Sequence, residues 1–454
     1  MRSASGQVKE LFEMDRGAPG RILSNSVWII IQHLYSMITS MVLVALIARH
    51  LGPSDYGWIN YCTSYITLFT TLSGLGLDNV IVSEIIRRPG KEGSYLGTAI
   101  VMRLVMSLLS YPMLLAVISA VNPGNRTLLA VASLQAIGMV FQTYDVLVYW
   151  FKIKLKMKYV SIAIIVAVSM TSVIRVILLI RKATVEWFAL SLSVQSFLIA
   201  VIIIAVFVKK KGTGLKFSIA DARSLLRLSY NCIISSISII IYMEADKIIL
   251  EKMTDSAHVG IYSAAVMLAT YWQFVPMALI DSTRPVVLEK KKVSDKEYLD
   301  QFKLVLAGTN TLSFVFAMIM SCFSWLFISF VYGNDYIEAV IPLVILSWAS
   351  FIGTSGSARS IWIAGESYYS YDKWFTVTAA VLNVGLDVLL IWKFGIVGAA
   401  AATLITYVYE VLIVPLFFRK TRVFTKLYFQ SFSMIPRFMS ESVKMLHGRF
   451  GRKQ

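Results

Sequence analysis

The sequence predicts an all-α polytopic membrane protein, with twelve transmembrane helices in two six-helix bundles. Three observations support this class: the composition, the length of the apolar runs and the placement of the basic residues. Of the 454 residues, 57% are hydrophobic and only 15% are charged, whereas soluble globular proteins carry about 25% charged residues. A water-soluble core could not bury so much apolar surface, so we expect most of it to face lipid.

The apolar runs have the length that a membrane requires. A helix needs about 20 residues to cross the hydrocarbon core of a bilayer, and runs of about this length recur throughout the chain. The twelve predicted spans are 25–48, 58–80, 96–121, 127–150, 159–180, 185–208, 229–251, 260–283, 304–331, 337–363, 373–392 and 396–418.

The basic residues indicate the orientation, because cytoplasmic loops are enriched in Lys and Arg. With the N-terminus placed in the cytoplasm, the inner segments hold 33 basic residues and the outer loops hold 6. The remaining four, Arg103, Arg175, Lys247 and Arg359, lie inside predicted spans. This asymmetry predicts that both termini are cytoplasmic.

The same layout predicts the domain organisation. A leader (1–24), a first bundle (25–208), a linker (209–228), a second bundle (229–418) and a basic tail (419–454) follow one another. The net charge of +17 sits in short clusters between apolar runs, which argues against a nucleic-acid partner. The tail mixes aromatic and basic residues, which suits a helix on the anionic inner leaflet; a partly disordered tail is the alternative.

The two halves resemble each other when the chain is shifted by 203 residues. Gly57 then falls on Gly260, Asp78 on Asp281 and Tyr95 on Tyr298. Each stretch reads as a helix, a short outer turn, a helix that ends near Asp and a basic inner loop. Two repeated bundles related by a pseudo-twofold axis, with a central cavity, are a transporter architecture.

Chemistry of other kinds has little support. Three cysteines in or beside apolar segments and four scattered histidines predict neither a disulfide framework nor a metal site. No loop is long enough to form a soluble catalytic domain. We therefore expect a protein that is not an enzyme and needs no cofactor.

Four motifs resemble those of bacterial polysaccharide repeat-unit flippases, which are the polysaccharide transporter family of the multidrug/oligosaccharidyl-lipid/polysaccharide exporter superfamily. These motifs are ALIARHLGPSDYGWINY at 45–61, EADKIILEKMTDSAHVGIYSAA at 244–265, VYGNDYIEAVIPLVIL at 331–346 and LNVGLDVLLIWKFGIVGAAAATLI at 382–405. They occur in order from the first span to the last.

The resemblance implies a flippase of the bacterial cytoplasmic membrane that works by alternating access. Its cargo would be an undecaprenyl-pyrophosphate-linked oligosaccharide for O-antigen, capsule or exopolysaccharide synthesis. H⁺ or Na⁺ is the expected coupling ion, with the membrane potential as the alternative driving force. A polysaccharide polymerase and a chain-length regulator are the candidate protein partners. Two alternatives remain: a cation-coupled exporter of drugs or small molecules with the same fold and, more distantly, a membrane glycosyltransferase or polymerase.

Such a cargo predicts which charged residues carry transport. A diphosphate needs cations in a partly desolvated site, and Arg suits it because its planar fork donates two parallel hydrogen bonds. Arg103 and Lys247 lie well inside their spans and are the first candidates. Arg175 and Arg359 come second, since a long side chain near a helix end can reach the interface instead.

Carboxylates inside spans are candidates for ion coupling or gating. The candidates are Asp78, Asp145, Glu244, Asp246, Asp281 and Glu410. Asp78 and Asp281 lie near the inner ends of related spans, which suggests a gate that pairs with Arg or Lys. Simple hydration at the membrane surface is the alternative for these two, and a self-neutralising ladder with Lys247 is the alternative for Glu244.

Sugar binding favours flat apolar rings with polar tips. Aromatic residues make up 13% of the chain, and most aromatic residues in membrane proteins belong to the core or the interfacial belt. The candidates for sugar contact inside the spans are Tyr65, Tyr144, Tyr242, Tyr271 and Trp272.

Overall fold

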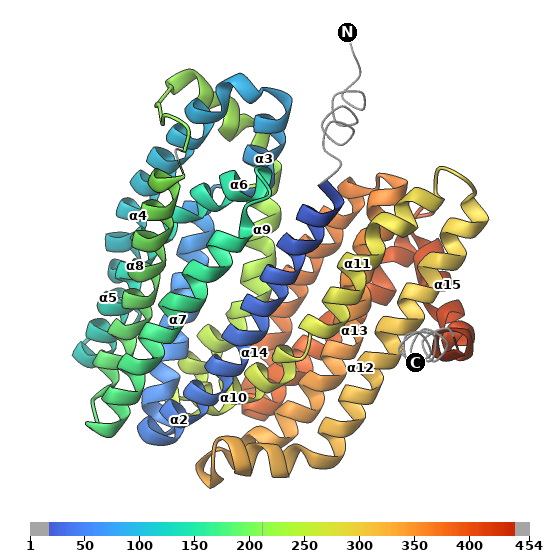
Figure 1. The fold of residues 1–454 in the computed structure, drawn as a ribbon. Coiled ribbons are helices and arrows are strands. Elements are labelled where there is room, and N and C mark those ends of the chain that lie inside the picture. Colours follow the sequence, from blue (N-terminus) through green and yellow to red (C-terminus); the bar gives the residue numbers. More distant parts are fainter. Residues whose placement is uncertain (1–17, 211, 441–454) are drawn as a thin grey trace, which may run out of the picture. The chain divides into compact units, whose positions relative to one another are not determined.

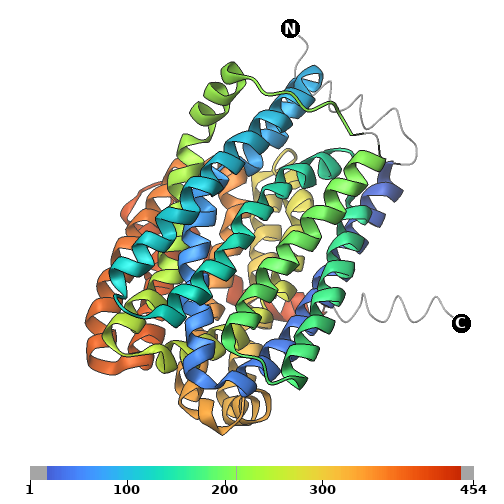
Figure 2. The same cartoon turned by 90° about the vertical axis from the view of Figure 1, so that its left-hand side faces the viewer.

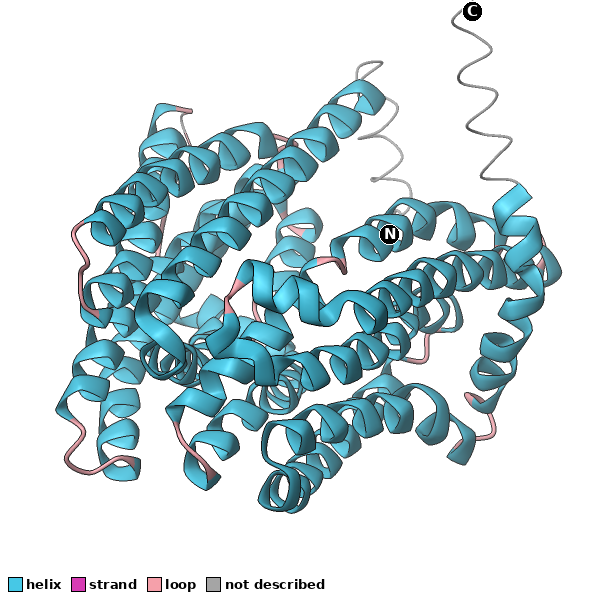
Figure 3. Cartoon of the chain, turned by 90° about the horizontal axis from the view of Figure 1, so that it is seen from below, coloured by secondary structure: helices cyan, strands magenta, loops and turns pink. Residues whose placement is uncertain are grey.

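The computed structural model describes residues 18–210 and 212–440, and within these residues it contains helices and short loops but no strand (Figure 3). Nine of its helical segments are long and apolar enough to cross a membrane. The predicted leader lies mostly outside the described residues, as do the last fourteen residues of the predicted tail. The all-α membrane fold is confirmed.

Contacts divide the chain into two compact units, Met1–Ile240 and Ile241–Gln454. In the first unit, α5 packs against α4 and α8, and α8 packs against α7, as neighbouring upright helices (Figures 1 and 2). Its elements are α2 (Ala18–Gly74), α3 (Asp78–Arg87), η1 (Pro89–Lys91), α4 (Glu92–Val121), α5 (Arg126–Phe141), η2 (Gln142–Tyr144), α6 (Asp145–Ile153), α7 (Met157–Ile180), α8 (Val185–Lys209) and the first part of α9 (Ile219–Met253).

The second unit begins inside α9, and its α13 packs against both α12 and α14. The other elements are α10 (Ser256–Tyr271), α11 (Phe274–Lys290), α12 (Asp295–Val331), η3 (Asn334–Ala339), α13 (Val340–Glu366), α14 (Tyr369–Val408), η4 (Tyr409–Ile413), η5 (Val414–Phe417), α15 (Arg422–Ser431) and η6 (Phe432–Met434).

Two long helices bend at glycines that adopt conformations closed to other residues. Gly52 in α2 has φ 75° and precedes Pro53, and Gly395 in α14 has φ 56°. Positive φ costs little for glycine, and proline cannot continue the hydrogen bonding of the helix before it. Each bent helix supplies two of the predicted spans. The predicted span 229–251 lies in α9, which is not among the nine segments, so helices of the described chain cover all twelve predicted spans.

Helix boundaries repeat at the predicted spacing of 203 residues. The second part of α2 begins at Pro53 and α10 begins at Ser256. In the same register, α3 ends at Arg87 and α11 at Lys290, while α4 begins at Glu92 and α12 at Asp295. The two halves therefore share a backbone plan as well as the few matching residues seen in the sequence.

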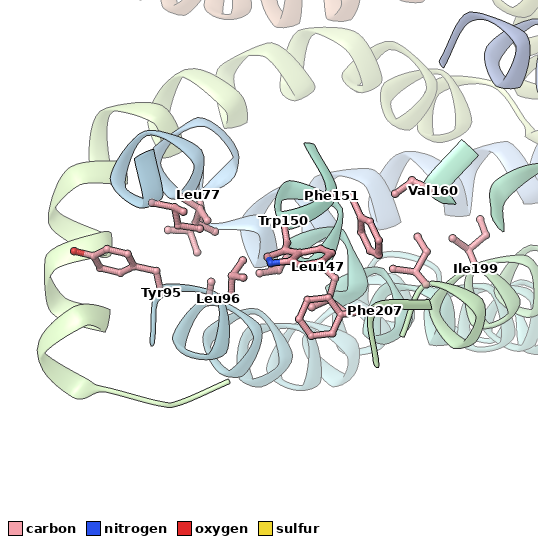
Figure 4. Close-up of a cluster of buried hydrophobic side chains, with 14 of the residues drawn as sticks. Leu77, Tyr95, Leu96, Leu147, Trp150, Phe151, Val160, Ile199 and Phe207 are labelled. Atoms are coloured by element: carbon pink, nitrogen blue, oxygen red, sulfur yellow. The ribbon is translucent and has the colours of Figure 1, made fainter. Parts of the chain in front are cut away.

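The core of the first unit lies between α3, α4, α6, α7 and α8. Its buried side chains form a row from Tyr95 and Leu96 past Trp150 and Phe151 toward Ile199 (Figure 4). Trp150 stacks edge-on against Phe151, with ring centres 5.0 Å apart. This apolar packing holds α3 and α6 against α4, and these are the elements that carry the site described below.

The linker after α8 lies against the start of α4, where it closely approaches two glycines (Figure 2). The Lys216 amide donates to the Gly93 carbonyl at 3.1 Å, and a Cβ on Gly97 would lie 2.5 Å from the Lys216 carbonyl oxygen. Asp221 accepts from Lys91 at 2.9 Å and from Ser94 at 2.6 Å. Hydrogen bonding to the Lys91 ammonium lowers the pKa of the Asp221 carboxyl.

Gly97→Val is expected to displace this linker, because the new side chain would overlap the Lys216 backbone. Limited proteolysis should then cut between residues 212 and 218 faster than in the wild-type chain. Lowering the pH should also speed cleavage of this linker in the wild-type chain, but less than Gly97→Val does. A lowered carboxyl pKa contributes stability at neutral pH that is lost as the pH falls through that pKa. Gly90→Val is the matched control, since a Cβ there meets no atom within 4 Å; equal cleavage of the two variants would contradict the docking.

The part of the tail that the structure describes is packed against the second unit rather than lying alone at the surface. Phe424, Leu427 and Tyr428 on α15 are buried, and Asn310 on α12 donates to Ser431 at 3.1 Å. The sequence prediction of a surface or partly disordered tail missed this packing. The apolar face of α15 was visible in the sequence, but its packing partner on α12 was not.

Candidate functional site

The first unit contains a cavity of about 340 Å³ around one buried cation, Arg103. Arg103 is only 6% exposed, and its guanidinium forms an ion pair with Asp78. It also donates to the Tyr149 hydroxyl at 3.4 Å, and Tyr149 in turn bonds to Asp78. Asp145 lines the same cavity. A buried charge requires partners of this kind. The charge of Arg103 on α4 is therefore already neutralised by Asp78 in this structure.

Local backbone geometry brings these groups together. Leu75 and Gly76 both have positive φ, which turns the chain sharply between α2 and α3. Asp78 is therefore the first residue of α3, and Asp145 is the first residue of α6. Since α3, α4 and α6 pack against one another, their polar residues converge on Arg103.

The balance of charge in this cavity is unusual for an anion site. One guanidinium faces two carboxylates, Asp78 and Asp145. The Asp78 side chain is 64% exposed, whereas that of Arg103 is 7% exposed. Asp78 is thus the partner that an incoming ligand could replace while Arg103 stays in place.

The second unit contains a smaller cavity, of about 60 Å³, beside Asp246. Asp246 is 5% exposed and accepts from the Tyr262 hydroxyl at 2.6 Å and from the Lys247 backbone amide at 2.7 Å. Tyr242, Thr403 and Tyr407 also line this cavity. The volume exceeds that needed to hold one water molecule, so a small cation or water can fit.

A second carboxylate, Asp387, lies close enough to Asp246 for their charges to interact. Asp387 is fully buried, and its Oδ1 has no hydrogen-bond partner among the described residues. In the orientation that satisfies its neighbours, the Asn383 amide donates to Asp387 Oδ2 and to the Tyr242 carbonyl, both at 3.1 Å. Two buried carboxylates whose charges repel each other would be stabilised by a bound proton or cation.

The other predicted cations are held by partners of their own. Lys247 pairs with Glu244 at 2.7 Å, one turn away on the same helix. Arg359 is 2% exposed, pairs with Glu410 at 3.0 Å and lies 5.0 Å from the centre of the Phe375 ring. These pairs are typical of structural ion pairs that lower the cost of burying charge.

Arg175 and Asp281 differ from the rest. Arg175 is buried on α7 and donates to Ser191 at 3.0 Å and to Gln195 at 3.1 Å. Asp281 is exposed on α11, and no ion pair joins it to another residue that the structure describes. Within the described residues, the predicted symmetric gate therefore has an ion pair at Asp78 and none at Asp281.

The five aromatic candidates are mostly engaged in packing. Tyr65 contacts Tyr61 edge-on at 5.1 Å, Tyr144 packs against the apolar core and Trp272 stacks on Phe316 at 4.3 Å. Tyr242 lines the small cavity beside Asp246. Tyr271 is half-buried at the end of α10.

Sequence reasoning missed several residues of these sites. Tyr149, Asn383 and Asp387 were not among the predicted site residues. Asp387 lies 141 positions after Asp246, so no local spacing could have linked them. The sequence did contain one signal for this site. Asn383 and Asp387 are polar residues four positions apart in an apolar span, so they share one helix face.

Comparison with known proteins agrees with this fold. Residues 22–287 match the family described as "Polysaccharide biosynthesis protein". A stretch of 217 residues is 28% identical to the "Probable low-salt glycan biosynthesis flippase Agl15" of Haloferax volcanii. The match covers 46% of this chain and 44% of that protein, so it spans less than half the length of this relative.

Two solved structures show the same fold. One is an inward-facing multidrug resistance MATE family transporter of the MOP superfamily, with a TM-score of 0.66 and 14% identity, covering 89% of this chain and 96% of that one. The other is lipid II flippase MurJ in an inward closed conformation, with a TM-score of 0.66, 16% identity and 91% coverage of both chains. Because the family match covers more than half of the sequence, the chain belongs to the polysaccharide biosynthesis protein family.

Proposed function

We propose that this protein is a flippase that moves an undecaprenyl-pyrophosphate-linked oligosaccharide across the bacterial cytoplasmic membrane. The observation that carries the proposal is the buried guanidinium of Arg103 facing a cavity, in a chain of this family. The names of its relatives support a lipid-linked glycan as cargo. Alternating access would move this cargo for O-antigen, capsule or exopolysaccharide synthesis.

The Arg103 site suggests how the diphosphate would be held. Asp78 forms an ion pair with the Arg103 guanidinium in this structure. A bound diphosphate would replace Asp78 and accept bidentate hydrogen bonds from Arg103. The exchange replaces one anion by another, so the buried cation never loses its partner. The Tyr149 hydroxyl accepts from Arg103 and donates to Asp78, and it would donate to the diphosphate once Asp78 is displaced.

Ion coupling would lie in the second unit. Asp246 and Asp387 cannot both stay charged in a buried site without a counter-charge, and H⁺ or Na⁺ would supply it. The Oδ1 of Asp387, which has no partner among the described residues, and the small cavity lined by Asp246 favour this position. Binding and release of the ion would then bias the conformation of the helices that carry the two carboxylates.

The predicted surroundings follow from this role. Both termini would be cytoplasmic, the basic part of the tail would contact anionic lipid, and a polymerase and a chain-length regulator would act on the delivered repeat units. The Lys and Arg asymmetry of the loops supports this orientation.

Deletion of the gene in the organism that carries it tests the proposal. We expect complete repeat units to accumulate on the lipid carrier inside the cell and the surface polymer to be lost, because flipping lies between these steps. Re-expression of the wild-type gene is the control. Normal surface polymer in the deletion strain, with increased sensitivity to toxic cations, would contradict the proposal.

A second candidate is a cation-coupled exporter of small molecules, and one observation favours it. Carboxylates outnumber guanidinium groups among the residues that line the Arg103 cavity, which would suit a cationic cargo. The fold is also shared with a multidrug transporter. The two functions make opposite predictions for Arg103 and Asp145, which are given in the Discussion.

A further inference from the structure

A second cavity in the first unit adjoins the Arg103 site and differs from it in chemistry. Its volume is about 350 Å³. Thr70 and Thr71 line both cavities, so the two meet along α2. The hydroxyl cavity, as we call it, is lined by Thr63, Ile66, Thr67, Thr70, Thr71, Gln135, Gly138, Gln142, Leu192, Gln195 and Ser196.

The lining is polar but uncharged among the residues that the structure describes. Eight of its eleven residues carry a hydroxyl or an amide side chain, and Ile66 and Leu192 are its two large apolar residues. A charged ligand would find no counter-ion here, and an apolar ligand would strip water from many polar groups. A neutral ligand rich in hydroxyl groups fits this lining best.

The threonines present oxygen acceptors in a row. The hydroxyls of Thr63, Thr67 and Thr71 donate to backbone carbonyls one turn earlier, at 2.7, 2.8 and 2.9 Å. Each hydroxyl hydrogen is thus used within the helix, while the oxygen can still accept. The four-residue spacing keeps these oxygens on one face of α2, spanning about 12 Å at 1.5 Å per residue.

The glutamines complement this row. Arg175 donates to the Gln195 side-chain oxygen at 3.1 Å, which leaves the Gln195 NH₂ group as a donor. Gln135 donates to Thr63 at 2.6 Å, but its own Oε1 has no partner among the described residues although the residue is only 6% exposed. The Thr70 hydroxyl likewise has none. Each such buried polar atom destabilises the empty cavity unless a ligand or water satisfies it.

We propose that the hydroxyl cavity binds the sugar portion of the cargo, while Arg103 binds its diphosphate. This inference rests on the proposed function and adds a division of labour to it. Neutral sugars offer hydroxyl groups that both donate and accept, which matches the threonine oxygens and the glutamine amides. The aromatic residues predicted from the sequence would then be packing residues rather than the main sugar contacts.

The position of the two cavities agrees with the shape of such a cargo. In the predicted orientation, the second part of α2 runs from the outer turn at Gly52 toward the inner side. Thr63 therefore lies farther from the inner membrane surface than Gly74. A lipid-linked glycan entering from the inner side would leave its diphosphate near Arg103 and extend its sugars toward Thr67 and Thr63. A ligand that bridges both cavities must carry an anionic group directly joined to a neutral polyhydroxyl group.

The test compares binding of two probes to the purified full-length protein: undecaprenyl pyrophosphate without sugar, and the same lipid carrying the oligosaccharide extracted from the host. The variant is Thr63→Val with Thr67→Val, which removes two hydroxyls and keeps the branched shape of the side chains. We expect its affinity for the glycosylated lipid to fall about tenfold, as loss of two neutral hydrogen bonds predicts, with affinity for the sugar-free lipid unchanged.

Two matched variants control for folding and for hydroxyl loss in general. Thr63→Ser with Thr67→Ser keeps both hydroxyls and should bind like the wild type. Thr378→Val removes a hydroxyl that makes the same bond one turn back, to Trp374 at 2.9 Å, on α14, and should also have no effect. If the Thr63/Thr67 valine variant loses affinity for both lipids equally, or for neither, the sugar assignment is wrong. If the wild-type protein binds neither lipid, the proposed function itself fails.

Discussion

Replacing Arg103 by Ala is expected to abolish transport of the lipid-linked cargo. Among the described residues that line the cavity beside Asp78, the Arg103 guanidinium is the cation. Hydrogen bonds to charged groups contribute about 1.5–3 kcal/mol each. Loss of a bidentate contact should therefore weaken binding of the sugar-free lipid pyrophosphate by about one hundredfold or more. Arg103→Lys should fall between, because Lys keeps the charge but lacks the planar fork.

Replacing Asp78 is expected to change affinity for the lipid pyrophosphate in the opposite direction. Asp78→Asn removes the internal anion that competes for Arg103, so affinity for the lipid pyrophosphate should rise while Arg103→Ala lowers it. Lys393→Ala, on an exposed lysine of α14, is the matched control for lost positive charge and should have no effect. If Arg103→Ala exports a cationic dye normally and Asp145→Asn loses that export, the exporter function is favoured instead.

Replacing Asp387 by Asn is expected to uncouple transport from the ion gradient. The amide keeps the size of the side chain but cannot hold a proton or supply a full charge to a cation. Transport into proteoliposomes should then proceed at the same slow rate with or without an imposed Na⁺ or pH gradient, whereas the wild-type protein should be accelerated by one of the two. Asp246→Asn should behave likewise, since the two carboxylates share the site.

Thermal stability separates this effect from misfolding. Asp387 Oδ1 has no partner among the described residues, so Asn should cost no hydrogen bond at that atom and should remove an unfavourable buried charge. We expect an unfolding temperature equal to or above that of the wild type. Asp281→Asn, on an exposed carboxylate, is the control. If gradient-driven acceleration survives in Asp387→Asn, the coupling site lies elsewhere.

The fold was largely predictable because its signals are local. Apolar runs of the length of a bilayer, and basic residues in alternate loops, depend on a few neighbouring residues and on the solvent they meet. Even the repeat of 203 residues, visible in few identities, reappears in the bounds of α10, α11 and α12. The tail was harder, because whether α15 lies on a membrane or on α12 depends on a partner distant in the sequence.

The candidate sites were predictable as separate residues but not as arrangements. Arg103, Asp78 and Asp145 were each singled out as charges inside spans, yet no spacing indicated that α3, α4 and α6 would bring them to one cavity. Asp246 was singled out in the same way, but its partner Asp387 was not among the candidates. Arg359 shows the converse, since its burial reflects an ion pair with Glu410 rather than an open site.

The most direct test of the central claim is reconstitution of the purified chain in vesicles with a lipid-linked oligosaccharide of the host. The measurement is the fraction of glycan that becomes accessible, over time, to a glycan-cleaving enzyme added outside. We predict that the wild-type chain exposes the initially enclosed fraction and that Arg103→Ala vesicles retain it. Glycan that stays enclosed with the wild-type chain, while the same vesicles transport a cationic dye, would contradict the account.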